Sequence, residues 1–258
     1  MLSRILEIVL LLALVLGQAQ AAGTVLTVDM KGTITPASDD IVLAALERAE
    51  AEDARALMLL LDTPGGGLAE TTEILRLIDE SDIPVIGYVH PEGAAAWSAG
   101  TIILIGSDIA AMAPHTIIGS AQPVQFSPTG STVPVNDSKT TNAIVAMIEE
   151  KARKHGRNTT AAREFVLSNL NLNADEAMKY RVVEHIAPTP EELLAQINGT
   201  SIKDATLITK DAKLEAFEPP LNLQFLKMLS DPTIAGLLML IGLYSLIFGI
   251  SSPGMGAE

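Results

Sequence analysis

The sequence has no cysteine and only four histidines. The absence of cysteine excludes disulfide bonds, a thiol nucleophile and cysteine-ligated zinc, and the histidines are too scattered to predict a metal site. Basic residues are also scarce, with 17 Lys and Arg against 31 Asp and Glu, which gives a net charge of −14. Because a surface that binds nucleic acid must be basic, we expect no nucleic-acid partner. We also expect no metal and no cofactor.

Charge is missing altogether from one long run near the end of the chain. Residues 233–252 contain no charged side chain and are almost all apolar. Since about 20 apolar residues cross the core of a bilayer, we predict a transmembrane helix over 233–252. A buried core helix is the alternative interpretation. The preceding segment, 221–232, is predicted to be a juxtamembrane linker, whose weakly amphipathic part, 221–229, is expected to lie on the membrane surface. The tail, 253–258, ends so abruptly that we expect a truncated chain.

The first 22 residues have the pattern of an export signal. Arg4 precedes an apolar run from Ile8 to Leu16, and Ala19-Gln20-Ala21 follows. These are the three regions of a secretory signal peptide, so we predict cleavage, with an uncleaved anchor as the alternative. The domain over 23–220 is then expected to lie outside the cytoplasm, tethered to the cell membrane.

Within that domain, short apolar runs alternate with amphipathic helical patterns. The predicted strands are 24–30, 56–61, 84–89, 109–112 and 182–186. The predicted helices include one capped by Ser38, Asp39 and Asp40, one through 72–78, and those over 138–155, 160–167, 173–180 and 190–197. Such alternation predicts an α/β fold of right-handed βαβ units, with a parallel sheet and functional residues at the carboxyl ends of its strands. The Pro- and Gly-rich segment 115–136 is predicted to be a mobile loop that covers the site.

A single hydroxyl in a run of small residues is the first candidate for chemistry. Ser98 lies in the stretch from Gly93 to Leu104, where small residues give way to an apolar helix. Small neighbours let a substrate backbone approach, and a helix start offers free N–H groups such as that of Ala99. The alternative is that Ser98 is only a small residue at a tight helix–strand contact.

A glycine-rich turn supplies a second element of the predicted site. Asp62-Thr63-Pro64-Gly65-Gly66-Gly67 follows a buried strand but lacks the Gly-Lys-Ser/Thr ending of a phosphate loop. The unobstructed N–H of Gly65 or Gly66 can act as an oxyanion donor beside that of Ala99. A plain tight turn is the alternative interpretation.

The general base is less evident from the sequence. None of His90, His115, His155 and His185 has an obvious carboxylate partner. Lys139 lies where the long loop meets a predicted helix, and the positive end of a helix dipole favours a neutral amine that can accept a proton. A solvated surface charge is the alternative for Lys139.

Three motifs together resemble the Clp/crotonase superfamily, and within it the NfeD-type membrane-bound serine proteases, also called stomatin operon partner proteins (STOPP). They are Asp62-Thr63-Pro64-Gly65-Gly66, Ala95-Ala96-Trp97-Ser98-Ala99-Gly100-Thr101 and Ile118-Gly119-Ser120-Ala121-Gln122-Pro123. The resemblance covers about 24–188. It implies a Clp/crotonase-like βαβ spiral and a Ser–Lys dyad.

In this resemblance Ser98 is the nucleophile, Lys139 is the general base, and Gly65 or Gly66 with Ala99 forms the oxyanion hole. Clp-type peptidases with a Ser-His-Asp triad carry their histidine just before the Gln-Pro pair, where this chain has Ala121. The resemblance further implies cleavage of hydrophobic, membrane-proximal segments, stomatin as a partner, and a homodimer or higher homo-oligomer.

Two other functions use the same fold. A crotonase-type acyl-CoA enzyme would use the two N–H donors on a thioester enolate, but an exported domain has no access to cytosolic CoA. A non-catalytic scaffold for membrane-protein assembly would need neither Ser98 nor Lys139. We therefore predict a serine endopeptidase.

Overall fold

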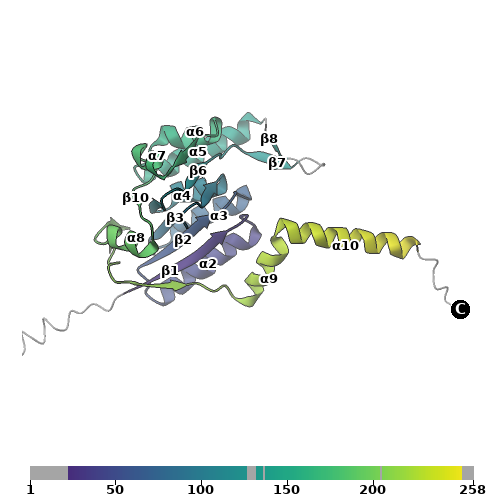
Figure 1. Ribbon diagram of the computed structural model, residues 1–258, viewed down its shortest axis with the longest axis horizontal. Coiled ribbons are helices and arrows are strands. Elements are labelled where there is room, and N and C mark those ends of the chain that lie inside the picture. Colours follow the sequence, from purple (N-terminus) through teal and green to yellow (C-terminus); the bar gives the residue numbers. More distant parts are fainter. Residues whose placement is uncertain (1–22, 127–131, 136, 204, 252–258) are drawn as a thin grey trace, which may run out of the picture.

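The computed structural model describes residues 23–126, 132–135, 137–203 and 205–251 (Figure 1). The predicted signal peptide, 1–22, and the tail, 253–258, lie outside these residues. The described part comprises the domain and the helices that follow it.

The main sheet has six strands, all parallel, in the order β10-β5-β3-β2-β1-β13. The strands are β1 (Thr24–Lys31), β2 (Ala56–Asp62), β3 (Val85–Val89), β5 (Ile109–Met112), β10 (His185–Ile186) and β13 (Lys213–Ala216). The predicted α/β class is confirmed, and four of the predicted strands are correct to within one residue at each end. The strand predicted over 182–186 is shorter, because only its last two residues pair with β5.

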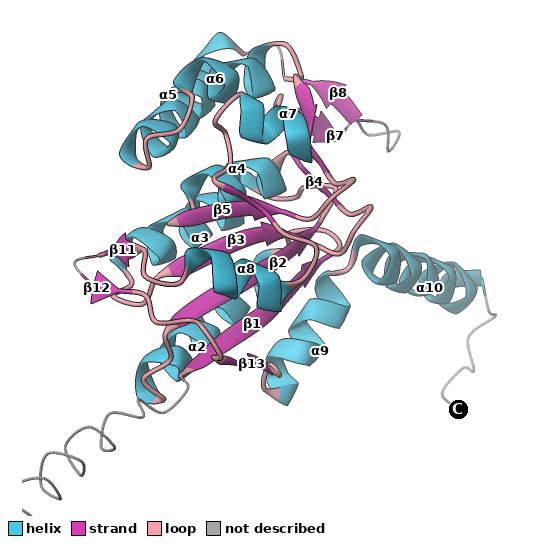
Figure 2. Cartoon of the chain, turned by 60° about the vertical axis from the view of Figure 1, so that its left-hand side comes forward, coloured by secondary structure: helices cyan, strands magenta, loops and turns pink. Residues whose placement is uncertain are grey.

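Helices cover both faces of this sheet, as Figure 2 shows. The larger layer is built from α2 (Pro36–Ala51), α3 (Leu68–Glu80), α4 (Ala99–Gly106), α5 (Ser138–Lys154), α6 (Thr159–Leu167) and α7 (Ala174–Lys179). The opposite face is covered by α8 (Pro190–Ile197). The predicted helices over 138–197 are confirmed to within one residue.

The alternation of side chains along β2 produces these two cores. Leu57, Leu59 and Leu61 point to the large helical layer, whereas Ala56 and Met58 pack with α8. Successive side chains of a strand face opposite ways, so a run that is apolar at every position fits only a strand covered on both sides. This is why the sequence pattern located β2 so closely.

The start of α2 differs from the prediction. We expected Ser38, Asp39 and Asp40 to cap this helix, but Thr35 is the N-cap and Pro36 is the first helical residue. The Ser38 hydroxyl instead accepts the Thr35 N–H at 3.0 Å, from inside the first turn. Proline is favoured at this first position because its missing N–H would have no helical partner there.

The segment 115–136 is not one irregular loop, so that prediction was wrong in part. Ile117–Gly119 form β6, which pairs with β4 (Ala95–Trp97) and β9 (Asn171–Asn173) in a second, three-stranded sheet. Beyond it, β7 (Val124–Phe126) and β8 (Thr132–Pro134) form an antiparallel pair that projects from the domain (Figure 1). A further short hairpin, β11 (Ser201–Ile202) with β12 (Ala205–Thr206), lies on the α8 side.

Two helices follow the last strand of the sheet. The predicted linker contains α9 (Leu221–Ser230), which packs on α2. Next comes α10 (Pro232–Ser251), which extends away from the domain (Figure 1). Among the described residues, α10 is the one helix that is long and apolar enough to cross a membrane. The apolar segment is Pro232–Ile250, with a mean hydropathy of 2.2, and no part of it is buried against the domain.

Candidate active site

Ser98 lies at the junction between β4 and α4. Its backbone has φ 52° and ψ −113°, which is uncommon for a residue with a side chain, and its N–H donates to Gly119 O of β6 at 2.9 Å. Such a conformation costs free energy and persists only where the surroundings enforce it. The turn exposes part of the Ser98 side chain while the next residue, Ala99, is already buried in α4.

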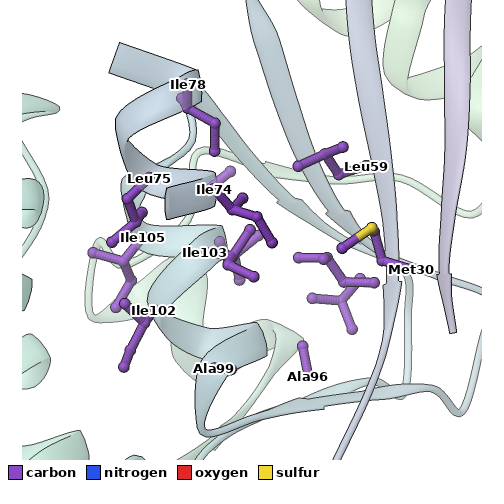
Figure 3. Close-up of a cluster of buried hydrophobic side chains, with 14 of the residues drawn as sticks. Met30, Leu59, Ile74, Leu75, Ile78, Ala96, Ala99, Ile102, Ile103 and Ile105 are labelled. Atoms are coloured by element: carbon purple, nitrogen blue, oxygen red, sulfur yellow. The ribbon is translucent and has the colours of Figure 1, made fainter. Parts of the chain in front are cut away.

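The helix behind Ser98 is buried along its length and is capped at its far end. Every residue of α4 is buried, and Figure 3 shows Ile103 and Ile105 beside Ile74 and Leu75 of α3. At its far end the Arg157 guanidinium donates to Ile105 O at 2.6 Å and Ser107 O at 2.7 Å, and it pairs with the Glu184 carboxylate at 2.7 Å. Arg157 thereby satisfies carbonyl groups that the end of a helix leaves unpaired.

The glycine-rich turn after β2 packs directly against Ser98. A β-carbon on Gly65 would lie 2.7 Å from Ser98 Cβ and 3.2 Å from its Oγ. The backbone of Gly65 also has φ 112°, which favours glycine. Sequence positions 65 and 98 are thus brought together as predicted, with no room for a side chain between them.

The three predicted oxyanion donors are not equivalent. The Gly65 N–H donates to Thr63 Oγ1 at 3.0 Å, and Gly65 itself is buried. The Ile34 N–H donates to Gly65 O, and the Ile34 carbonyl accepts the N–H of Gly67. The N–H of Gly66, which lies between these two partners, therefore points away from Ile34. Gly66 is exposed, and in the part of the chain that the structure describes neither its N–H nor that of Ala99 has a hydrogen-bond acceptor. The N–H groups of Gly66 and Ala99 are therefore the better candidates for the two oxyanion donors.

Sequence reasoning missed the residues that hold the two halves of the site in register. Thr63 pairs with Ala96 of β4, which docks the glycine-rich turn beside Ser98. The buried Thr101 hydroxyl donates to Ala96 O at 2.7 Å and accepts the Gly119 N–H at 2.8 Å. Thr101 lies in the same motif as Ser98, three positions after it, but its hydroxyl bonds across two strands and this cannot be read from spacing.

Lys139 lies in the first turn of α5, as predicted. Asp137 caps this helix by accepting the N–H of Lys139 and of Thr140, each at 3.1 Å. The bond from the Thr140 hydroxyl, together with these two N–H bonds, holds the pKa of the Asp137 carboxyl below its usual range. Lys139 is exposed and lines a groove of about 470 Å³ between α5 and α3.

The groove is mostly apolar and begins beside the glycine-rich turn. Its remaining lining residues are Leu68, Thr72, Asp137, Thr140, Ala143, Ile144 and Met147. Leu68 directly follows Gly67, so the turn that contacts Ser98 continues into the groove that contains Lys139. Over the described ranges, however, no hydrogen bond joins Lys139 Nζ to Ser98 Oγ. The structure therefore brings Lys139 to the neighbouring groove without closing a dyad.

The histidines offer no alternative base among the residues described. His115 is exposed and lies 3.7 Å from Glu92, while His90 stacks on Tyr88 with ring centroids 5.0 Å apart. His185 belongs to β10, at the far edge of the sheet. His155 ends α5, where burial and the nearby Arg157 and Lys154 lower its pKa to about 4.

Comparison with known proteins gives a consistent family match. The family model described as "NfeD1b, N-terminal domain" matches residues 24–212. The chain is 36% identical over 258 residues to the membrane-bound protease PH1510 of Pyrococcus horikoshii, covering 97% of this chain and 58% of that protein. It is 28% identical over 213 residues to the membrane protein NfeD1b of Bacillus subtilis, covering 80% and 47%. The chain thus spans about half the length of these relatives.

Solved structures extend the match to three dimensions. The chain is similar, with a TM-score of 0.76 and 36% identity, to a lysine-to-alanine variant of the 1510-N membrane-bound stomatin-specific protease in complex with a substrate peptide. That match covers 82% of this chain and 99% of the other. A serine-to-alanine variant of the same protease matches with a TM-score of 0.73 and 38% identity, covering 78% and 100%. The predicted fold is therefore confirmed.

Proposed function

The chain belongs to the family of the NfeD1b N-terminal domain, and we propose that it is a membrane-anchored serine endopeptidase that works through a Ser98–Lys139 dyad. The observation that carries this proposal is the environment of Ser98. Its strained backbone sets the hydroxyl at the start of a buried helix with Gly65 against it, and the next residues in the chain after Gly65 and Ser98, Gly66 and Ala99, carry the two candidate donor N–H groups. A scaffold would gain nothing from such strain.

The assignment of Lys139 as the base is supported by its groove and by the relatives. The substituted lysine and serine named for the 1510-N structures are separated by the same number of positions as Lys139 and Ser98. A move of the first turn of α5 toward Ser98 closes the dyad, and a substrate that fills the apolar groove between α5 and α3 gives the reason for that move. Hydrogen bonds of catalytic groups often tighten only when substrate binds.

The proposed chemistry follows from these groups. Neutral Lys139 Nζ accepts the Ser98 hydroxyl proton as Oγ attacks the substrate carbonyl carbon, and the N–H groups of Gly66 and Ala99 hold the oxyanion. The ammonium of Lys139 then donates its proton to the departing amine as the peptide bond breaks. Water, deprotonated by Lys139, attacks the ester carbonyl carbon, the bond to Ser98 Oγ breaks, and the Lys139 ammonium returns its proton to Oγ as the second product leaves.

The substrate is proposed from the groove and from the relative's specificity. Leu68, Ala143, Ile144 and Met147 give the groove an apolar lining that suits hydrophobic side chains. The 1510-N relative is stomatin-specific, so we propose a hydrophobic, membrane-proximal segment of a stomatin-type protein as the substrate. The remaining parts of the proposal are an extracytoplasmic domain and a homodimer or higher homo-oligomer.

A fluorophosphonate probe tests the nucleophile without knowledge of the substrate. An activated Ser98 displaces fluoride from phosphorus, so the purified full chain in detergent gains the mass of the adduct on the peptide that contains Ser98. Ser98→Ala is expected to stay unlabelled and Lys139→Ala to label more slowly. Absence of labelling in the unsubstituted chain would favour the scaffold, and turnover of an acyl-CoA thioester would favour the crotonase-type enzyme.

A further inference from the structure

The helix α9 carries two apolar faces, of which the domain covers only one. Leu223 and Leu226 pack against the main core. On the other side Leu221, Phe225, Met228 and Leu229 are large apolar residues with exposures of 80%, 59%, 48% and 37%. Exposure of four large apolar side chains on a helix of ten residues is unfavourable in water, so this face is expected to contact a partner.

Helix geometry places these two sets on opposite sides. With about 100° per residue, Leu221, Phe225 and Met228 fall within one narrow sector, and Leu223 and Leu226 fall about half a turn away. Leu229 lies at the border of the exposed sector, next to Asn222. The polar residues Asn222, Gln224 and Lys227 occupy the flanks between them. One face of α9 thus packs on the domain, the opposite face is apolar and exposed, and polar residues separate the two. An exposed apolar face bordered by polar residues is typical of a helix that lies in a membrane surface.

The chain that follows α9 points to a bilayer as the occupant of this face. Asp231 has an extended backbone, with ψ 125°, and separates α9 from α10. Its carboxylate then caps α10 by accepting the N–H of Thr233 at 2.8 Å and of Ile234 at 3.2 Å. The chain can therefore change direction at Asp231, from a helix on the membrane surface to one that crosses it, and Figure 1 shows that the two helices do not share an axis.

The position of α9 connects the membrane to the candidate site. Lys227 lines a small cleft together with residues 29–34, at the carboxyl end of β1. Ile34 bridges to Gly66 of the glycine-rich turn, and Gly65 of the same turn contacts Ser98. The helix therefore lies at the same edge of the sheet as the site, and in Figure 2 α10 leaves the domain from that side.

From these observations we propose that α9 lies in the surface of the bilayer, with Leu221, Phe225, Met228 and Leu229 among the acyl chains. The opposite face of α9 packs on α2. The end of the domain that carries the candidate site therefore faces the membrane. The net charge of −14 gives anionic lipids no general attraction, so the contact is apolar. This proposal rests on the membrane-anchored protease proposed above, through α10 as the span.

The test uses single-cysteine variants of the full chain, which has no native cysteine. Phe225→Cys, Leu240→Cys in α10 and Ile208→Cys are each spin-labelled and reconstituted in phosphatidylcholine vesicles. Ile208 is the matched control, because it is an exposed apolar residue, 39% accessible, in the segment that leads into the amino end of β13, whereas the site lies at the carboxyl ends of the strands. Phe225 is 59% exposed, so its replacement leaves the packing of α9 on α2 intact.

Relaxation by oxygen, which concentrates in lipid, is compared with relaxation by a water-soluble nickel chelate. We expect the labels at 225 and 240 to respond to oxygen and to resist nickel, and the label at 208 to do the reverse. If the label at 240 responded to oxygen but the label at 225 responded to nickel, the placement of α9 in the membrane surface would be refuted and α10 would still be the membrane anchor. A label at 225 shielded from both reagents, with spin–spin broadening, would assign the face to a second copy of the chain. Water signals at both 225 and 240 would refute the anchor as well.

Discussion

Gly65 and Ser98 touch so closely that a single added β-carbon would lie 2.7 Å from the Ser98 side chain. Gly65→Ala must therefore push the nucleophile out of place, in addition to the strain of a side chain at φ 112°, which costs about 1–3 kcal/mol. We expect loss of cleavage together with a lower free energy of unfolding. Peptide cleavage and thermal unfolding in detergent measure the two effects.

Gly32→Ala is the matched control for that substitution. Gly32 also has a positive φ, 85°, but a β-carbon there meets no atom within 4 Å. It is expected to lower stability through backbone strain while cleavage continues. Equal loss of activity in both variants would show that strain, and not the contact with Ser98, matters.

The base role of Lys139 predicts a loss of cleavage when its amine is removed. Lys139→Ala is expected to lower kcat by about 100- to 10,000-fold, because Ser98 then has no group that accepts its proton. Initial rates of peptide cleavage measure this loss, and full activity in Lys139→Ala would refute the dyad.

His155 predicts a different effect, on stability in acid. Its pKa is lowered to about 4 by burial and by Arg157 and Lys154, whereas an unfolded histidine titrates near 6.5. The unfolded chain therefore binds a proton first, and stability present above pH 6.5 is lost as the pH falls toward 4. The loss is at most about 2 kcal/mol, since the side chain is only partly buried.

The difference between the full chain and His155→Gln isolates this contribution. Denaturant unfolding at a series of pH values is expected to show a shallower decline between pH 6.5 and 4 for His155→Gln. His115→Gln, at an exposed position, serves as the control. Identical slopes for the unsubstituted chain and His155→Gln would contradict the assignment.

Arg157 predicts a large loss of stability far from the site. Its guanidinium is buried, caps α4 and pairs with Glu184. Arg157→Ala leaves these carbonyls without their donor and removes the cation beside Glu184, which keeps the bond from the Ala110 N–H, at a cost of about 3–5 kcal/mol. Arg163→Ala, which removes an exposed pair with Glu149 at 3.4 Å, is expected to cost less than about 1 kcal/mol. Thermal melts compare the two, and similar melting temperatures would contradict the capping role.

The main sheet could be predicted because burial on both faces leaves a strong pattern. β2 and β3 are continuous apolar runs, and α8 begins at a proline and was placed correctly at both ends. The strands β4, β6 and β9 have three residues each, too few for any periodicity, and we missed them. Their pairing is nevertheless what sets the backbone of Ser98.

The candidate site was predicted only in its components. The motifs around Gly65 and Ser98 indicated a nucleophile and its donors, and the fold brings them into contact. Which glycine N–H is available depends on the bond from Gly65 to Thr63, which arises from the turn geometry. The relation of Lys139 to Ser98 depends on how α5 packs, and spacing along a chain carries no such information.

The most direct test of the peptidase is cleavage of a hydrophobic peptide by the full chain in detergent beside Ser98→Ala. The peptide has the sequence of a membrane-proximal segment of a stomatin-type protein. We predict that the unsubstituted chain cuts the peptide and that Ser98→Ala, with the same thermal unfolding profile, does not. Equal cutting by both would contradict the assignment of Ser98 as the nucleophile.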